Sequence, residues 1–433
     1  MEINSQKQMR LFEISFAIYT MWYFLPIVRG SLFGGIWNVV FFSCYVVSVG
    51  LAFLKNLRIE TSKFTKRAVY PIIAYMVLLL FYMFFGETYL AGHIRVSFTF
   101  WGTFLFFMMT EKYSESQKRI AKFVLILFLV TYATTFYQLA TDPSLARKLT
   151  DASVEEDLRR VEMMKNIGDI YVVQMSILFV PFLMDLLIFK AKKTFHKILG
   201  LGILVLEFYF ILSASFTISL IVYVVSIAMS ILLLSGSKST MNTVMKVAGV
   251  GFFALILMQV DWVSLFDSIA SSIGNKYIAE RFYGLRDMFI TGVGTGDASD
   301  RPILYLMSLE TFYKNIYGVG LDYSYIPGSS GIGMHSQIFD DLARYGVLAV
   351  AFYITFFRNF YKMLFLKFKE IEMERAVLPT ILTYILFLCV NIGFRSPYES
   401  LIMLFVFPAL PLLFSKESKA EGKESILKEE NAQ

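Results

Sequence analysis

Apolar runs long enough to cross a lipid bilayer recur along almost the whole of this 433-residue sequence. A transmembrane helix needs roughly 17 to 25 predominantly apolar residues, and a hydrophobic content of 57% is well above that of soluble domains. The first run, 11–28, has no small-residue cleavage site and is followed at once by a second run, so we interpret it as a retained span rather than a signal peptide. The sequence therefore predicts an all-α integral membrane protein.

The apolar runs predict about twelve transmembrane helices. These cover 11–28, 31–54, 69–86, 96–110, 121–139, 169–189, 198–213, 216–234, 247–265, 337–357, 376–393 and 399–415. The chain then divides into helices one to nine (1–265), a large external loop carrying amphipathic helices (266–334), helices ten to twelve (335–415) and a tail (416–433). The tail is rich in Lys, Glu and Ser, which is typical of a disordered extension.

Basic residues crowd every second connection between the apolar runs, including 55–67, 112–122, 190–197 and 358–375. Cytoplasmic loops carry an excess of Lys and Arg, so these connections and both termini are expected in the cytoplasm. The net charge of +6 is spread over these clusters and forms no single stripe, which argues against a nucleic-acid partner. The two cysteines lie inside apolar runs, so neither a disulfide nor a metal site is expected.

Two external connections, 140–168 and 266–334, carry basic residues against this topological bias. An anionic ligand on the outer face is the simplest reason, and ion pairs with local acids such as Asp287 are the alternative. In the larger loop, Arg281 and Arg286 lie on one predicted amphipathic surface helix. A second such helix opens at Arg301, before a proline at its first turn.

Guanidinium groups match phosphate oxygens bidentately, so such helices beside the outer leaflet would suit a lipid diphosphate. Arg395, in the external turn between the last two predicted spans, is a further external cation. Two acids inside or near spans, Asp185 and Glu207, are also functional candidates by default, although the sequence names no partner for them.

His335 stands at the outer end of the predicted span 337–357. The positive end of the helix dipole favours a neutral imidazole there, and a neutral ring can accept a proton. Asp340, Asp341 and Arg344 follow on the same helix. Asp340 and Arg344 are four residues apart and could pair, which is a plain structural reason for these charges. The plainer alternative is an interfacial histidine with no catalytic task.

This arrangement resembles the Wzy-type polymerases of O-antigen and capsular polysaccharide, which are related to the O-antigen ligases. The resemblance is sharpest over 273–357, in the helix opened by Arg301, the Gly-Val-Gly stop at 318–320 and the segment HSQIFDDLARYG that begins at His335. A loose spacing of arginine and glycine from position 281 to 292 also matches the family. The serine-arginine pair of many members is missing, because Ser215 is followed by phenylalanine.

The resemblance implies a GT-C-like fold and a metal-independent, inverting glycosyl transfer that needs no cofactor, on the outer face of a bacterial inner membrane. A glycan on undecaprenyl diphosphate would pass to the sugar hydroxyl of a second lipid-linked repeat unit. His335 would deprotonate or orient that hydroxyl. The residues expected to bind the diphosphate are Arg281, Arg286, Arg301 and Arg395. Those expected to contact the sugars are Asp322, Tyr323 and Tyr325. Membrane lipid, a flippase and a chain-length regulator are the candidate partners.

Three other functions stay open at this point. An O-antigen ligase-type glycan transferase shares nearly all of these features. A lipid-linked oligosaccharide flippase or other transporter would place its polar groups between two repeated halves at mid-membrane, and no convincing internal repeat is present. A scaffolding membrane protein would not need the large arginine-bearing loop.

Overall fold

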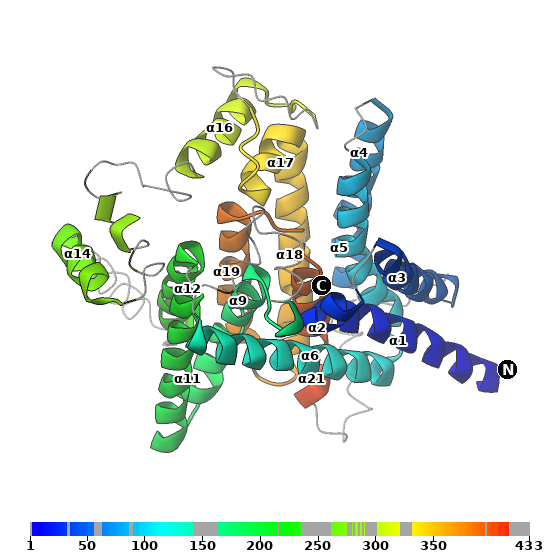
Figure 1. Cartoon of the computed structure of the whole chain (residues 1–433). Coiled ribbons are helices and arrows are strands. Elements are labelled where there is room, and N and C mark those ends of the chain that lie inside the picture. The colour runs from blue at the N-terminus through cyan, green and yellow to red at the C-terminus, as the bar shows by residue number, and fades with distance from the viewer. Residues whose placement is uncertain are drawn as a thin grey trace, which may run out of the picture.

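The computed structural model of the protein describes residues 2–32, 35–55, 63–85, 90–142, 145, 163–214, 216–234, 261–274, 279, 282–284, 286–287, 290, 301–320, 331–394 and 396–414. The regular elements in these ranges are all helices (Figure 1).

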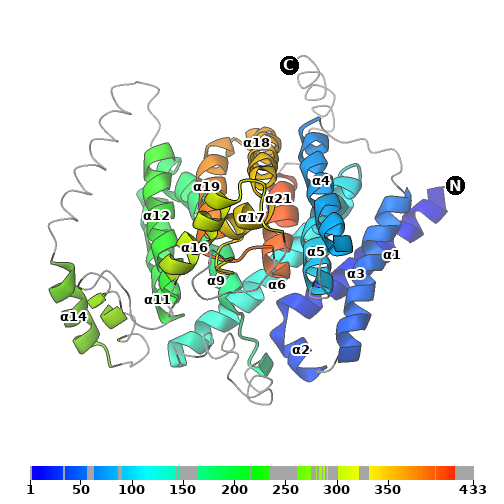
Figure 2. The ribbon, with the colours of Figure 1, turned by 90° about the horizontal axis from the view of Figure 1, so that it is seen from above.

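The N-terminal half of the fold contains long helices of 18 to 28 residues together with several short ones. Its helices are α1 (Glu2–Phe24), α2 (Pro26–Ser31), α3 (Gly35–Lys55), α4 (Lys63–Phe85), α5 (Leu90–Thr110), α6 (Ser114–Thr141), α9 (Ile170–Ile177), α10 (Val180–Met184), the π-helix η1 (Asp185–Phe189), α11 (Thr194–Ser213) and α12 (Thr217–Leu234). In Figure 2, helices α3, α4, α11 and α12 run in broadly the same direction, with α2 at the lower edge of the view.

The C-terminal half contains the elements on which the predicted site residues lie. They are α14 (Trp262–Ser272), α16 (Arg301–Lys314), α17 (Gln337–Tyr345), α18 (Val347–Lys369), η3 (Glu374–Ala376), α19 (Val377–Val390), α20 (Pro397–Glu399), the π-helix η4 (Ser400–Val406) and α21 (Phe407–Phe414). In Figure 1, α16 and α17 lie above the ends of α18 and α19.

Six of the described helical segments are long and apolar enough to cross a membrane. They are Gly35–Leu54, Ser114–Thr141, Ile170–Phe189, Thr194–Ser213, Val347–Lys369 and Pro397–Phe414. Several expose large apolar side chains, such as Ile198, Leu201 and Val205 of α11, which suits contact with lipid tails rather than water. The protein is therefore an all-α, multi-pass membrane protein, as the sequence predicts.

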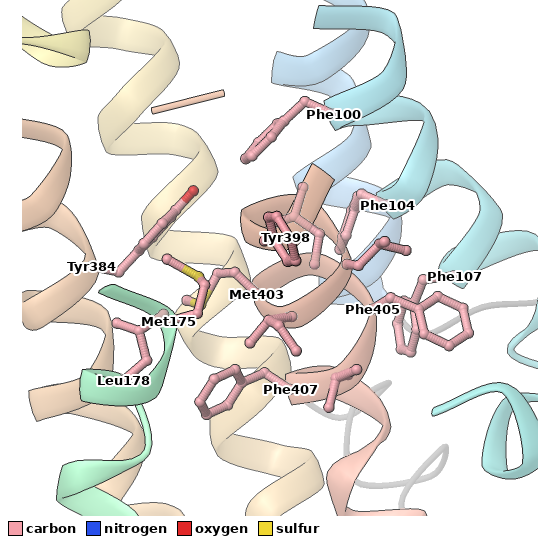
Figure 3. Close-up of a cluster of buried hydrophobic side chains, with 14 of the residues drawn as sticks. Phe100, Phe104, Phe107, Met175, Leu178, Tyr384, Tyr398, Met403, Phe405 and Phe407 are labelled. Atoms are coloured by element: carbon pink, nitrogen blue, oxygen red, sulfur yellow. The ribbon is translucent and has the colours of Figure 1, made fainter. Parts of the chain in front are cut away.

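The last apolar segment, Pro397–Phe414, is the most buried of the six: 78% of its residues are buried. Its residues from Leu401 to Phe407 are fully enclosed. Figure 3 shows Phe405 directed toward Phe107 and Phe407 on the side of Leu178. The ring of Phe407 stacks on that of Phe179, with centroids 4.8 Å apart.

The structure differs from the predicted helices in several places. The predicted helix 11–28 is interrupted at Leu25, between α1 and α2, and the predicted helix 169–189 is divided among α9, α10 and η1. The predicted span 337–357 is two helices, because Gly346 adopts a positive φ of 58° and ends α17 before α18 begins. Residues 247–260 of the predicted span 247–265 lie outside the described residues. Beyond it, Asp261 accepts a hydrogen bond from the Ser264 amide (3.1 Å) and caps a separate helix, α14.

Candidate functional site

The structure joins the connections that are predicted to be external. The turn after α1 meets the segment before α9, and both meet the turn between α19 and α20. The hydrogen bonds that join them are Ile27 N to Asn166 Oδ1 (3.4 Å), Arg29 Nη2 to Tyr398 Oη (3.2 Å), Tyr171 Oη to Ile392 O (3.3 Å) and Gln337 N to Asn391 O (3.0 Å). These contacts bring sequence positions more than 300 residues apart to one end of the bundle.

The connections predicted to be cytoplasmic are joined to one another in the same way. The ion pairs are Arg119 with Glu13 (2.7 Å), Lys367 with Glu111 (2.6 Å) and Lys190 with Asp185 (2.8 Å), and Lys190 also donates to the carbonyl of Glu372. Within the described residues, the two groups of connections use separate sets of contacts.

The C-terminal end of α19 provides the platform for the candidate site. The last carbonyls of a helix have no partner within it and must be satisfied from outside. Here they accept from Ser336 Oγ at Leu388 O (3.2 Å), from Tyr305 Oη at Val390 O (2.7 Å) and from Gln337 N at Asn391 O (3.0 Å). Helices α16 and α17 are therefore both anchored to the same helix end.

His335 lies in the turn between α16 and α17 and is half-buried. Its Nδ1 lies 3.1 Å from the carbonyl oxygen of Gly333. Because a carbonyl oxygen only accepts, this contact assigns the hydrogen to Nδ1 and leaves the lone pair of the neutral ring on Nε2. The backbone here is unusual: Met334 has a φ of 60°, and a Cβ on Gly333 would lie 2.1 Å from the carbonyl oxygen of Leu304. His335 is thus held one residue before the helix cap, Ser336.

Asp340 fixes this turn through hydrogen bonds on both sides of His335. Its Oδ1 accepts from the Met334 amide (3.1 Å) and its Oδ2 from the Ser336 amide (3.2 Å). Oδ1 also accepts from the hydroxyl of Ser308 on α16 (2.7 Å), and that hydroxyl in turn accepts from the Gly333 amide (2.9 Å). Burial raises the pKa of Asp340, and Arg344 and these hydrogen bonds lower it in part.

Arg344 pairs with Asp341, one position later than the predicted partner Asp340. Its Nη1 lies 3.3 Å from Asp341 Oδ1 in a fully buried setting. The other oxygen of Asp341 accepts from Tyr353 Oη (2.6 Å) and Gln337 Nε2 (2.8 Å). Burial raises the pKa of Asp341, and Arg344 opposes this rise. The carboxylate of Asp340 is instead turned toward α16, which explains why sequence spacing alone chose the wrong acid.

The Gly-Val-Gly segment at 318–320 caps the end of α17. The amides of Val319 and Gly320 donate to the carbonyls of Ala343 and Arg344, both at 2.9 Å. Gly318 has a φ of 85°, and a Cβ there would lie 2.2 Å from the Arg344 carbonyl oxygen. This segment does follow α16, as the sequence predicts, but α16 itself ends earlier, at Lys314.

The predicted diphosphate-binding arginines have different surroundings. Arg286 is engaged by two carboxylates, with Nη1 2.7 Å from Asp267 and Nη2 2.7 Å from Asp287, and its guanidinium lies over the ring of Tyr283. Arg286 therefore forms local ion pairs, which the sequence indicates as the alternative to binding an anionic ligand. Arg281, Arg395, Asp322, Tyr323 and Tyr325 lie outside the described residues.

Arg301 opens α16, the helix that also carries Ser308 and Tyr305. Tyr305, one turn further on, is tied to the end of α19 through its hydroxyl. Burial raises the pKa of Tyr305, and the nearby positive charge of Arg301 lowers it in part. Of the predicted arginines within the described residues, Arg301 is therefore the one that shares a helix with the residues around His335.

The two intramembrane acids have structural partners that the sequence did not reveal. Asp185 pairs with Lys190, five residues away across the π-helix η1. Glu207 accepts from the hydroxyls of Tyr132 and Ser176, both at 2.5 Å. These contacts account for both acids inside the bundle.

Within the described residues, no three His, Cys, Asp or Glu side chains are close enough to hold a metal ion. Comparison of the sequence with known protein families and with curated proteins finds no match. The functional argument for this protein therefore depends on its own residues.

Proposed function

We propose that the protein is a membrane glycosyltransferase that polymerises undecaprenyl-diphosphate-linked oligosaccharide repeat units into O-antigen, capsular polysaccharide or exopolysaccharide. The proposal includes about twelve spans in a GT-C-like arrangement, a bacterial inner membrane and both termini in the cytoplasm. It also includes the partners expected from the resemblance, a flippase and a chain-length regulator.

The observation that carries the proposal is the fixed, half-buried position of His335. Its Nδ1 is directed to the Gly333 carbonyl, and the two amides beside it are held by Asp340. A general base needs an unprotonated nitrogen with a defined direction, and Nε2 meets that requirement.

The chemistry then proceeds without a metal. The acceptor sugar hydroxyl attacks the anomeric carbon of the donor, and its proton passes to Nε2 of His335. The bond from the anomeric carbon to the diphosphate oxygen breaks, and its electron pair leaves with the diphosphate. Arg301, together with Arg281 and Arg395, stabilises the negative charge that develops on this leaving group. We do not include Arg286 in this step, because two carboxylates already engage it.

The test is His335→Ala in cells that depend on this protein, with membrane insertion checked by immunoblotting. We expect single lipid-linked repeat units on the outer face and no polymer. Normal polymer in this variant would overturn the role of His335. Loss of repeat units from the outer face would instead indicate a flippase. Intact polymer that is not attached to its final acceptor would indicate a ligase.

A further inference from the structure

The short helix α2 places an arginine at the end of the bundle where the predicted external connections meet. Helix α1 ends at Phe24, and Pro26 at the first position of α2 starts the new helix in a different direction (Figure 2). The amide of Ile27 donates to Asn166, which ties this turn to the segment before α9. Arg29 follows in the last turn of α2. A cation in a predicted external turn runs against the topological bias of membrane proteins.

The guanidinium of Arg29 has fewer partners than those of the three arginines that form ion pairs in the described part of the chain. Arg119, Arg286 and Arg344 each have a carboxylate oxygen within 3.3 Å. Within the described residues, Arg29 has no such ion pair, and its hydrogen-bond partner is the hydroxyl of Tyr398, at 3.2 Å from Nη2. Its Nε is buried and has no hydrogen-bond partner in the same part of the chain. The guanidinium of Arg29 therefore has five donors and, within the described residues, one hydrogen bond to the protein.

Asp169 is the acid whose pKa the charge of Arg29 affects, and its carboxylate already caps a helix. Its carboxylate caps α9 by accepting from the Tyr171 amide at 3.0 Å. Burial raises the pKa of Asp169, and the charge of Arg29 opposes that rise. Within the described residues Asp169 and Arg29 form no ion pair, so the carboxylate does not occupy the guanidinium.

The turn 391–398 links Arg29 to the turn that carries His335. Arg29 donates to Tyr398 at one end of it, and the Gln337 amide donates to Asn391 at the other. Helix α16, which Arg301 opens, is tied to the residue before this turn, because Tyr305 donates to the Val390 carbonyl. Helices α16 and α2 lie apart in both Figures 1 and 2. The two arginines therefore lie on different sides of the same turn, as binding groups for two separate ligands would.

We infer that Arg29 belongs to a second phosphate-binding site, which holds the diphosphate of a second lipid-linked substrate while Arg301 faces the first. This inference rests on the proposed function, in which two lipid diphosphates must be bound together. A guanidinium suits a diphosphate because it offers parallel donors and keeps its charge at any physiological pH. An anionic phospholipid offers the same phosphate chemistry, and the experiment separates the two sources.

The experiment measures how many lipids bind to the purified full chain by native mass spectrometry. Three phosphatidylcholine nanodisc samples are compared: one with added undecaprenyl diphosphate, one with phosphatidylglycerol at the same mole fraction, and one with inorganic diphosphate in the buffer. We expect wild type to bind two molecules of undecaprenyl diphosphate. Arg29→Ala should bind one, with affinity at the lost site weakened about tenfold or more, and Arg29→Lys should be intermediate.

Two control variants make the result specific. Arg119→Ala removes an arginine that is paired with Glu13 and should still bind two lipids. Tyr398→Phe removes the hydrogen bond to Arg29 but keeps its charge, and should also bind two. Binding of two lipids with unchanged affinity by Arg29→Ala overturns the inference. Equal binding of phosphatidylglycerol at this site overturns it as well, because the site would then be a general headgroup contact.

The outcome is independent of the test of the proposed function. His335→Ala should still bind two lipids, since in this scheme His335 acts on the acceptor hydroxyl and contacts neither diphosphate. If His335→Ala makes normal polymer while Arg29→Ala loses one lipid, the proposed function fails and the lipid site stands. If His335→Ala makes no polymer and Arg29→Ala binds two lipids, only the inference fails.

Discussion

The carboxylate of Asp340 lies 2.7 Å from the hydroxyl of Ser308, across the contact between α17 and α16. Through this bond and those to the amides of Met334 and Ser336, one buried acid determines the shape of the turn that presents His335. A residue with no direct part in the proposed chemistry thus decides where the proposed base points.

Asp340→Ala should destabilise the protein and lower polymer formation together. The substitution leaves two backbone amides without their partner, and each unsatisfied buried group costs about 1–3 kcal/mol. Ser308→Ala removes one hydrogen bond to Asp340 and the acceptor of the Gly333 amide. It should have a smaller effect, because one backbone amide rather than two loses its partner. Thermal unfolding in detergent and polymer yield in cells provide the two measurements. Full polymer yield from a folded Asp340→Ala protein would show that the turn does not depend on this carboxylate.

Gly318→Ala should lower the stability by more than about 1 kcal/mol, because a side chain with this positive φ is strained. Its Cβ would also lie 2.2 Å from the carbonyl oxygen of Arg344. Gly202→Ala in α11 is the matched control, since a Cβ there meets nothing within 4 Å. The control should unfold at the same or a slightly higher temperature, because alanine is the better helix former. Equal unfolding temperatures for the two variants would show that the close contact between Gly318 and the end of α17 does not contribute to stability.

Burial raises the pKa of Asp341 above its value in the unfolded chain. A carboxyl group with a raised folded-state pKa stabilises the protein fully below its unfolded pKa, and this contribution is lost as the pH rises through the folded-state pKa. The melting temperature of wild type should therefore fall, as the pH rises above about 4, more steeply than that of Asp341→Asn, which cannot ionise. Parallel curves for the two proteins would argue against this effect.

Arg301→Ala should lower polymer yield at least about tenfold, and Arg301→Lys should restore part of it, because lysine keeps the charge but not the paired donors. Arg286→Ala is the comparison, since Asp267 and Asp287 already occupy its donors. Its yield should stay near that of wild type. If Arg286→Ala lowers the polymer yield more than Arg301→Ala does, Arg286 rather than Arg301 binds the diphosphate.

Much of the framework follows from the sequence alone. Apolar length and the spacing of basic clusters predict a multi-pass helical protein and the way its connections alternate, because the bilayer fixes the length of a span and the position of its charges. The start of α16 at Arg301 follows from the proline beside it. No apolar run long enough to cross the membrane precedes His335 in the large loop, so a polar connection is predicted there. These properties depend on residues that are close together in the chain, so they can be predicted from the sequence.

The partners of the charged residues were decided only by the tertiary structure. Spacing on one helix suggested that Arg344 pairs with Asp340, but packing against α16 turns Asp340 to Ser308 and leaves Asp341 to the arginine. Arg29 and Tyr398 meet over 369 sequence positions, which no periodicity reveals. The apolar pattern tells which residues avoid water, whereas the direction of each polar group depends on which helix ends the fold brings together.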